Sequence, residues 1–250
     1  MNEQNISELT NILIPKRDQR VLPHCVGPIL DIGGGLNPLA CADCVLDIIA
    51  YDNRKVQRNE KYNADTWIQM DICNRQPWPF PDKYFAFVNC THVLEDVRDP
   101  VWVCSEIMRV GKAGYIECPS ILREITPGIP YEGSRYAGYY HHRWLVNIEG
   151  DVVEFIMKPH LLIEKWQLHL PAGWQQSLQD DRNSVSLAWN DHFEVRERFF
   201  DSRAEIEAFL RKIVLSTGAY PKWRYKAEWF LERVRPQLRR LHHTLTQSRE

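Results

Sequence analysis

The sequence lacks several features that would point at once to a class of protein. Its net charge is only -2, from 31 Lys and Arg against 33 Asp and Glu, so no excess of either sign indicates a nucleic-acid partner. The first twenty residues are polar with one short apolar stretch, which is neither a signal-peptide core nor a membrane span. We therefore expect a cytoplasmic protein that binds no nucleic acid.

Cysteine is present, but not in the patterns of a disulfide framework or a zinc ribbon. The seven cysteines are odd in number and low in density, which is typical of reduced thiols. Cys41 and Cys44 form a CxxC pair, but no second pair stands at the matching spacing. His141, His142 and His160 also lack a ligand spacing, so the sequence predicts no metal site.

Between residues 23 and 120, short apolar runs alternate with helix-like or irregular segments. This alternation is typical of a parallel sheet covered on both faces. The expected strands are 28–30, 44–49, 67–72, 84–90 and 114–119. A helix is expected after Asp99, which can cap it, with Pro100 in its first turn.

After residue 120 the pattern changes. Two β-type runs around Gly150 predict a hairpin within residues 141–158. From about residue 202 the chain has the apolar periodicity of a helix. Its apolar stripe consists of Ile206, Phe209, Leu210, Ile213 and Val214.

The segment ILDIGGGLNPL places Asp31 shortly before Gly33 and Gly35. Glycines in such a turn let the backbone approach a ligand closely because they carry no Cβ. The dinucleotide fingerprint needs a third glycine where this chain has Pro38. A carboxylate here would also repel a pyrophosphate but attract the ammonium and sulfonium of S-adenosylmethionine. The turn therefore favours a methyl-donor pocket over an NAD pocket.

Two more acids follow apolar runs. Asp47 can accept the hydrogens of both ribose hydroxyls, and Asp71 can accept the adenine amino hydrogen while Ile72 supplies an apolar face. The alternative is that Asp47 and Asp71 only cap helices. Three acids at successive strand ends favour the cofactor interpretation.

Four segments carry a resemblance to a known family: LDIGGG, MDI, WPFPDKYFAFVNCTHVLEDVRDP and EIMRVGKAGYIECPS. Together they span residues 28 to 120 and resemble the class I S-adenosylmethionine-dependent methyltransferases, specifically the methyltransferase-11-like group. The resemblance implies an α/β, Rossmann-like methyltransferase fold, with a mostly parallel seven-stranded sheet, helices on both faces and a C-terminal helical extension. It also implies S-adenosylmethionine as cofactor, bound by Asp31, Gly33, Gly35, Asp47, Asp71, Ile72 and the fourth-strand tip from Asn89 to His92.

The chain departs from the family pattern at three places. Ala86 replaces a common Asp, Asp96 replaces a usual second His, and residues 111–114 replace the usual LKPGG. With these differences in mind, we divide the chain into four parts. They are an N-terminal helix or extension (1–22), the S-adenosylmethionine-binding core (23–120), an acceptor-side insertion with the remaining strands (121–200), and C-terminal helices (201–250).

The acceptor side is expected in the segment GYYHHRW. Methyl transfer is an in-line displacement, so alignment supplies much of the catalysis, and a base is needed only if the acceptor must lose a proton. The candidate catalytic residues are His92, just past the fourth strand, and His142 and Arg143 in this segment. The alternative for His92 is a polar residue that lines the adenosine pocket; for the segment, it is a hairpin with a solvated polar side.

These features predict an S-adenosylmethionine-dependent methyltransferase that acts on oxygen or nitrogen of a small-molecule or glycan acceptor. A non-catalytic methyltransferase-like scaffold and an NAD-dependent oxidoreductase are the alternatives. A scaffold would have no need to keep the strand-end acids together. An NAD-dependent oxidoreductase is disfavoured by Pro38, which stands where the dinucleotide fingerprint has its third glycine.

The last thirty residues, 221–250, are basic, with eight Lys and Arg against three Glu, and tryptophans are interleaved with these charges. The pattern fits a basic amphipathic helix that makes a peripheral contact with an anionic membrane or a lipid-linked substrate. The favoured alternative is an end helix packed on the domain with its basic face in water.

Overall fold

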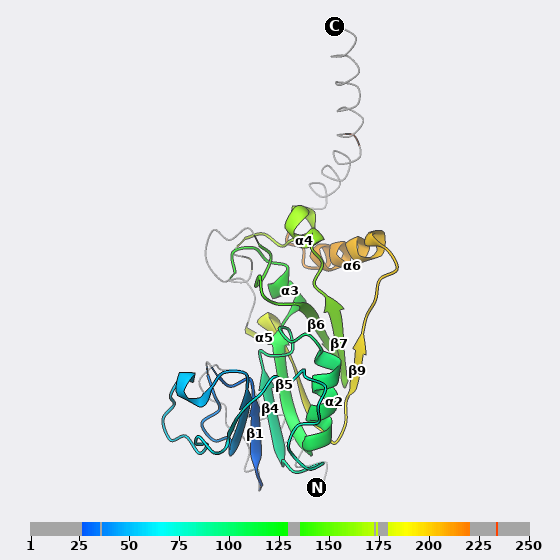
Figure 1. The fold of residues 1–250 in the computed structure, drawn as a ribbon. Coiled ribbons are helices and arrows are strands. Elements are labelled where there is room, and N and C mark those ends of the chain that lie inside the picture. Colours follow the sequence, from blue (N-terminus) through cyan, green and yellow to red (C-terminus); the bar gives the residue numbers. More distant parts are fainter. Residues whose placement is uncertain are drawn as a thin grey trace, which may run out of the picture.

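The computed structural model describes residues 27–35, 37–129, 136–172, 174, 180–220 and 234. These residues form a six-stranded sheet and a separate three-stranded sheet (Figure 1). Across the larger sheet the strands are β3 (Trp67–Gln69), β2 (Cys44–Asp47), β1 (Ile29–Ile32), β4 (Phe87–Thr91), β5 (Ala113–Pro119) and β8 (Ser184–Asn190). The smaller sheet consists of β6 (Trp144–Glu149), β7 (Val152–Met157) and β9 (Glu194–Glu197).

The larger sheet is parallel except at one edge. Strands β3, β2, β1, β4 and β5 pair in parallel, and β8 pairs with β5 antiparallel. The mostly parallel sheet of the Rossmann-like methyltransferase fold is therefore confirmed. The expected count of seven strands differs from the six in the described residues, because the predicted hairpin β6–β7 pairs with β9 instead of joining this sheet.

Helix α2 (Pro100–Val110) begins where the sequence predicts, because the Asp99 side chain accepts a hydrogen bond from the backbone N–H of Trp102 and Pro100 occupies the first position. Helix α6 (Arg203–Ser216) has Ser202 as its N-cap. The other helical segments are one turn each: η1 (Tyr51–Asn53), α3 (Ile121–Glu124), α4 (Leu161–Glu164), η2 (Trp166–Leu168) and α5 (Asp180–Asn183).

The two faces of the larger sheet are covered differently. One face packs its alternate residues, such as Leu30 and Val88, against α2 and the smaller sheet. The other face carries Ile29, Val45 and Phe87, and these residues pack with others from the connecting segments. Among the described residues, helices thus cover one face and not both as expected, because the links from β1 to β2 and from β2 to β3 form turns and η1 instead of α-helices.

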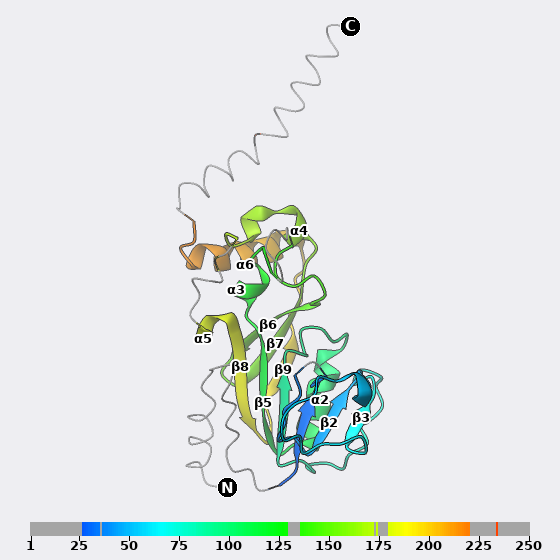
Figure 2. The ribbon, with the colours of Figure 1, turned by 90° about the vertical axis from the view of Figure 1, so that its left-hand side faces the viewer.

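A second core lies beyond the end of the larger sheet. Helices α4 and α6 lie together, far from β1–β3, in both views (Figures 1 and 2). The predicted apolar stripe of α6 packs there, with Leu210 and Val214 fully buried among residues of α3, β6, β7 and η2. Within the part of the chain that the structure describes, no helix has the length and apolar character needed to span a bilayer. The predicted N-terminal extension (1–22) and the basic segment 221–250, apart from residue 234, lie outside the described residues.

Candidate functional site

The strand order reverses at β1, whose two neighbours are β2 and β4. In open α/β sheets, ligands bind at such a switch point beyond the carboxyl ends of the strands. A cavity of about 520 Å³ lies there, which is in the usual size range for a small-molecule site. Its walls include eight residues that the sequence analysis named as cofactor or catalytic candidates: Asp31, Gly33, Gly35, Asp47, Asp71, Ile72, His92 and Arg143.

The glycine turn fits closely between β1 and the loop after β4. Gly33 has a φ of +69°, and a Cβ at this position would collide with the side chain of Val93. A Cβ on Gly34 would lie 2.5 Å from Asp31 Oδ2. Only glycine therefore permits this turn at the cavity wall.

Asp31, on β1, is buried and held in place from two sides. Its Oδ1 accepts a hydrogen bond from Asn89 Nδ2 at 2.6 Å, and its Oδ2 accepts one from the backbone N–H of Leu39 at 2.7 Å. Asn89, predicted as a cofactor contact, is not among the cavity-lining residues. Its place in the fold is to orient Asp31.

Asp47 lies at the end of β2 and also lines the cavity. Its Oδ2 accepts a hydrogen bond from the backbone N–H of Gly35 at 2.7 Å, and its Oδ1 accepts one from that of Ile49 at 2.6 Å. This carboxylate ties the glycine turn to β2. It caps no helix, in contrast to the alternative that the sequence left open.

Asp71 lies two residues beyond β3 and pairs with Arg98. The distance from Arg98 Nη1 to Asp71 Oδ2 is 2.7 Å, and the backbone N–H of Cys73 donates to Asp71 Oδ1 at 2.9 Å. The amide of Cys73 and the guanidinium of Arg98 together lower the pKa of Asp71. Asp71 is thus ionised at the cavity wall at neutral pH.

His92 follows β4 with a φ of +57°. Its Nε2 lies 3.3 Å from Glu117 Oε1, and its Nδ1 lies 3.4 Å from Glu95 Oε1. Glu117 and then Glu95 raise the pKa of His92 to about 9, against the opposing effect of burial. An imidazolium has no lone pair for a proton, which speaks against the base role that the sequence analysis considered for His92.

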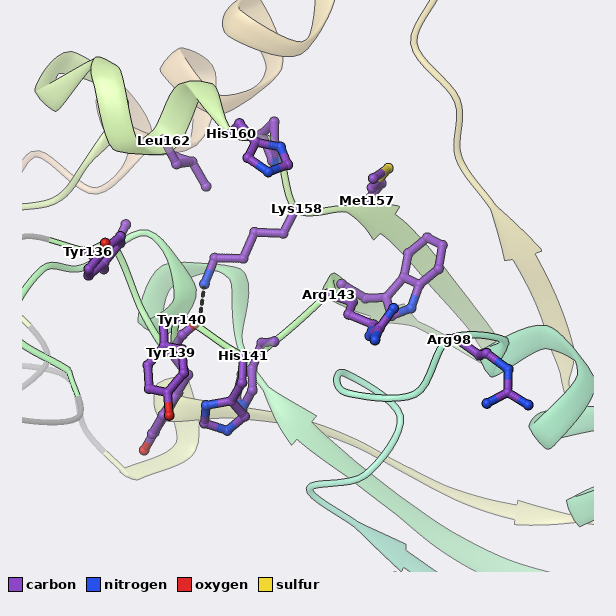
Figure 3. A pocket seen from close by; sticks show the side chains of 14 residues that line it. Arg98, Tyr136, Tyr139, Tyr140, His141, Arg143, Met157, Lys158, His160 and Leu162 are labelled. Atoms are coloured by element: carbon purple, nitrogen blue, oxygen red, sulfur yellow. Dashed lines mark hydrogen bonds between the residues drawn. The ribbon is translucent and has the colours of Figure 1, made fainter. Parts of the chain in front are cut away.

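A second cavity, of about 490 Å³, adjoins the first and shares Arg98 and Arg143 with it. The predicted acceptor segment forms one of its sides, with Tyr139, Tyr140 and His141 on a loop that faces Lys158 at the end of β7 (Figure 3). Tyrosine rings at such a wall offer apolar faces for a ring-shaped ligand.

The acceptor segment is fastened to the loop after β4 through its backbone. The carbonyl oxygen of Glu95 accepts hydrogen bonds from the N–H groups of Arg143 and Trp144, at 2.7 and 3.1 Å. The indole Nε1 of Trp144 donates to the carbonyl of Val97 at 2.8 Å. These bonds bring Arg143 to the wall between the two cavities.

His142 belongs to a buried polar group. Its Nδ1 lies 2.8 Å from Glu124 Oε1, and Lys158 Nζ donates to Glu124 Oε2 at 2.6 Å. The side chains of His142 and Lys158 are each less than one eighth exposed. The ring of Tyr139 stacks on that of His142, with centroids 4.5 Å apart. Burial opposes ionisation of Glu124, but His142 and Lys158 outweigh it and lower its pKa.

Sequence reasoning missed three residues of this region. Gly34 stands between the two glycines that were named, Arg98 stands in the quoted segment LEDVRDP, and Asp96 was noted only as a departure from the family pattern. The side chains of Asp96 and Arg98 could be assigned to the site only once the loop after β4 was seen to line the cavities. The cysteines that the structure describes are all free, and Cys41 and Cys44 are half-buried.

Comparison with known proteins identifies part of the chain. The family model described as a methyltransferase domain matches residues 30–116. A search of curated proteins found no significant match.

Several solved structures are similar to the chain at low identity. A methyltransferase from Thermotoga maritima is 19% identical, with a TM-score of 0.31 and coverage of 47% of this chain and 50% of that one. One from Mesorhizobium loti is 15% identical, with a TM-score of 0.33 and coverage of 56% and 62%. A phosphoethanolamine N-methyltransferase from Haemonchus contortus, in complex with S-adenosylmethionine, is 18% identical, with a TM-score of 0.31 and coverage of 47% and 28%.

The chain spans about half the length of the first solved structures that it matches, and likeness at this level carries no argument about activity. The family match is the stronger finding, because it covers the glycine turn, strands β2 to β4 and most of β1 and β5. The comparison therefore shows that residues 30–116 match a methyltransferase-domain family.

Proposed function

We propose that the chain is an S-adenosylmethionine-dependent methyltransferase that methylates oxygen or nitrogen of a small-molecule or glycan acceptor. One observation carries the proposal: the glycine turn and three acids from successive strand ends line a single cavity at the switch point of the sheet. A second cavity adjoins it, so donor and acceptor would each have a place.

The first cavity would hold the methyl donor. Asp47 would accept hydrogen bonds from the ribose hydroxyls, and Asp71 would accept one from the adenine amino group beside the apolar face of Ile72. The close approach at Gly33 and Gly34 leaves backbone rather than side chain against the methionine part of the donor. Asp31, oriented by Asn89, would attract its ammonium group.

The second cavity would hold the acceptor. Arg143 lines both cavities and could hold a carboxylate or phosphate of the acceptor in bidentate fashion. Alignment of the acceptor atom with the methyl group would supply most of the rate enhancement, since sulfonium is a good leaving group.

Calorimetric titration of the full chain tests the proposal, with S-adenosylmethionine, S-adenosylhomocysteine and NAD as ligands. We expect both sulfur ligands to bind and NAD to bind far more weakly. Binding of NAD alone would identify an oxidoreductase. If the sulfur ligands bind but a broad screen of hydroxyl and amine acceptors yields no methylated product, the scaffold alternative is supported instead.

A further inference from the structure

Two histidines and an aspartate from different segments meet where the two cavities join. One ligand atom from each of Asp96, His141 and His142 lies within 4.8 Å of the others. Asp96 Oδ2 is 3.8 Å from His141 Nε2, and Asp96 Oδ1 is 3.9 Å from His142 Nε2. We propose that these three side chains bind a divalent first-row transition metal of the zinc type.

The spacing is close to that of a formed site. Ligand atoms bound about 2.1 Å from a tetrahedral metal lie about 3.4 Å from one another. The two distances, which run to different oxygens of Asp96, exceed this value by about half an ångström, and one ligand atom from each of the three residues lies within 4.8 Å of the others. The side chain of His141 is about half exposed and that of Asp96 is 39% exposed, so rotation of these two side chains can close the gap without a shift of the buried His142.

His142 is arranged as metal-binding histidines commonly are. Such a histidine donates one ring N–H to a carboxylate, which fixes its tautomer and leaves the other nitrogen free to bind metal. Here the Nδ1 of His142 lies 2.8 Å from the fully buried Glu124, whose second oxygen accepts from Lys158. The free Nε2 then faces Asp96, so Glu124 is a positioning residue for the proposed site.

Asp96 supplies an unsatisfied acceptor at the same point. Its Oδ1 is buried and accepts no hydrogen bond within the part of the chain that the structure describes. Buried carboxylate oxygens nearly always have a partner, because an unpaired one costs free energy. A cation between Asp96 Oδ1 and His142 Nε2 would satisfy both atoms.

The ligand set favours one class of metal. Two imidazoles and one carboxylate suit zinc and its first-row neighbours, whereas magnesium and calcium prefer oxygen ligands throughout. Three protein ligands also leave a position open. Asp96 lines the donor cavity and the histidines line the adjoining one, so that position would take an oxygen of the acceptor; this role rests on the proposed function.

Metal uptake by the full chain tests the proposal directly. The protein is stripped with a chelator and titrated with Zn²⁺ by calorimetry and with Co²⁺ by visible absorption. We expect one equivalent of each to bind, and His141→Ala and Asp96→Asn each to weaken binding by roughly tenfold or more. His160→Ala is the matched control, because His160 lines the same cavity outside the group, and its uptake should equal that of the unchanged chain.

Thermal unfolding establishes that each variant is folded. If Asp96→Asn does not fold, metal uptake by His141→Ala tests the site instead, because the His141 side chain is half exposed. Absence of uptake, or equal uptake by His141→Ala and the unchanged chain, would overturn the proposal. So would an NMR titration in which His142 is doubly protonated at neutral pH in the presence of Zn²⁺.

Titration with S-adenosylhomocysteine, before and after metal loading, separates this proposal from the proposed function. Metal uptake without nucleoside binding would refute the methyltransferase and leave the metal site. Nucleoside binding without metal uptake would refute the metal site alone.

Discussion

At the scale of single residues, the carboxylates around the donor cavity already accept hydrogen bonds from the protein. Asp47 accepts two backbone N–H groups, and Asp71 accepts one N–H group and a guanidinium. A carboxylate has about four lone-pair sites, so each acid keeps acceptor capacity for a ligand. The protein contacts orient these acids before any ligand arrives, and those of Asp71 also lower its pKa.

Asp47→Ala should weaken the binding of S-adenosylhomocysteine by about 1.5 to 3 kcal/mol, because two ribose hydroxyls lose a charged acceptor. Calorimetry measures the effect. Asp47→Asn, which keeps the shape of the side chain, separates loss of the ligand contact from loosening of the glycine turn. Asp52→Ala is the control, since Asp52 is an exposed acid on η1. Unchanged affinity in Asp47→Ala would show that the ribose lies elsewhere.

The charge of His92 predicts a pH dependence of stability. Its pKa of about 9 in the folded chain exceeds the ordinary value of 6.5, so its ion pairs with Glu95 and Glu117 stabilise the fold. This contribution is fully present below about pH 6.5 and is lost as the pH rises through about 9.

Urea unfolding at pH 6 and pH 9.5 checks this for the unchanged chain and for His92→Gln. At pH 6 the unchanged chain should have a larger free energy of unfolding than His92→Gln. At pH 9.5 this difference in unfolding free energy between the two proteins should be smaller. NMR titration of the imidazole gives the pKa directly, and a value near 6.5 would contradict the expected ion pairs.

At the scale of elements, the acceptor segment reaches its place through a close backbone contact. Gly138 has a φ of +61°, and a Cβ on it would lie 2.7 Å from the Cα and carbonyl oxygen of Glu124. Gly150, in the β6–β7 turn, has nearly the same φ of +62° but no heavy atom within 4 Å of such a Cβ. Substitution of the two glycines therefore distinguishes the effect of a left-handed backbone, which both share, from that of a steric collision, which only Gly138 has.

Gly150→Ala should lower the free energy of unfolding by about 1 kcal/mol, because alanine is strained in a left-handed backbone conformation. Gly138→Ala should cost clearly more, because the backbone of α3 must also move. Urea denaturation of both variants makes the comparison. Equal losses of unfolding free energy in the two variants would mean that residues 137–142 adapt without strain, and that the contact at Gly138 does not fix the position of the acceptor segment.

Arg143→Ala should lower turnover about a hundredfold once an acceptor has been found by screening, because a positioning group is lost. Donor affinity should change little, since the strand-end acids hold the nucleoside. Arg58→Ala, on an exposed loop before β3, serves as control. A turnover equal to that of the unchanged chain would remove Arg143 from the acceptor site.

Elements defined by neighbouring residues were predictable from the sequence. Asp99 and Pro100 set the start of α2, and Gly150 sets the turn of the β6–β7 hairpin. The partner of that hairpin was not predictable, because alternation along a strand reports burial and not which strand lies beside it. The meeting of Asp96 with His141 and His142 escaped notice for the same reason, since it depends on two loops that are distant in sequence.

At the scale of the whole molecule, the basic C-terminal segment lies outside the described residues, and its role stays a prediction. Deletion of residues 221–250 should leave the affinity for S-adenosylhomocysteine unchanged, because the described residues that line the donor cavity all precede residue 144. Binding to anionic vesicles should fall, since eight basic residues are removed.

Calorimetry and vesicle co-sedimentation, with neutral vesicles as control, measure these two effects. A folded truncated chain that no longer binds the nucleoside would place the segment in the active site. Equal vesicle binding by both chains would favour an end helix packed on the domain.

The distribution of cavity residues along the chain also bears on the order of folding. Among the described residues, those that line the donor cavity all precede residue 99 except Arg143, whereas those of the second cavity lie between 136 and 162 except for Arg98. Strand β8, which completes the larger sheet beside β5, comes later still, and its pairing must close the long intervening segment. A chain emerging from the ribosome would thus have every strand of the donor half available before the acceptor half is made. Arg98 and Arg143 would join the two halves only when the β6–β7 hairpin docks.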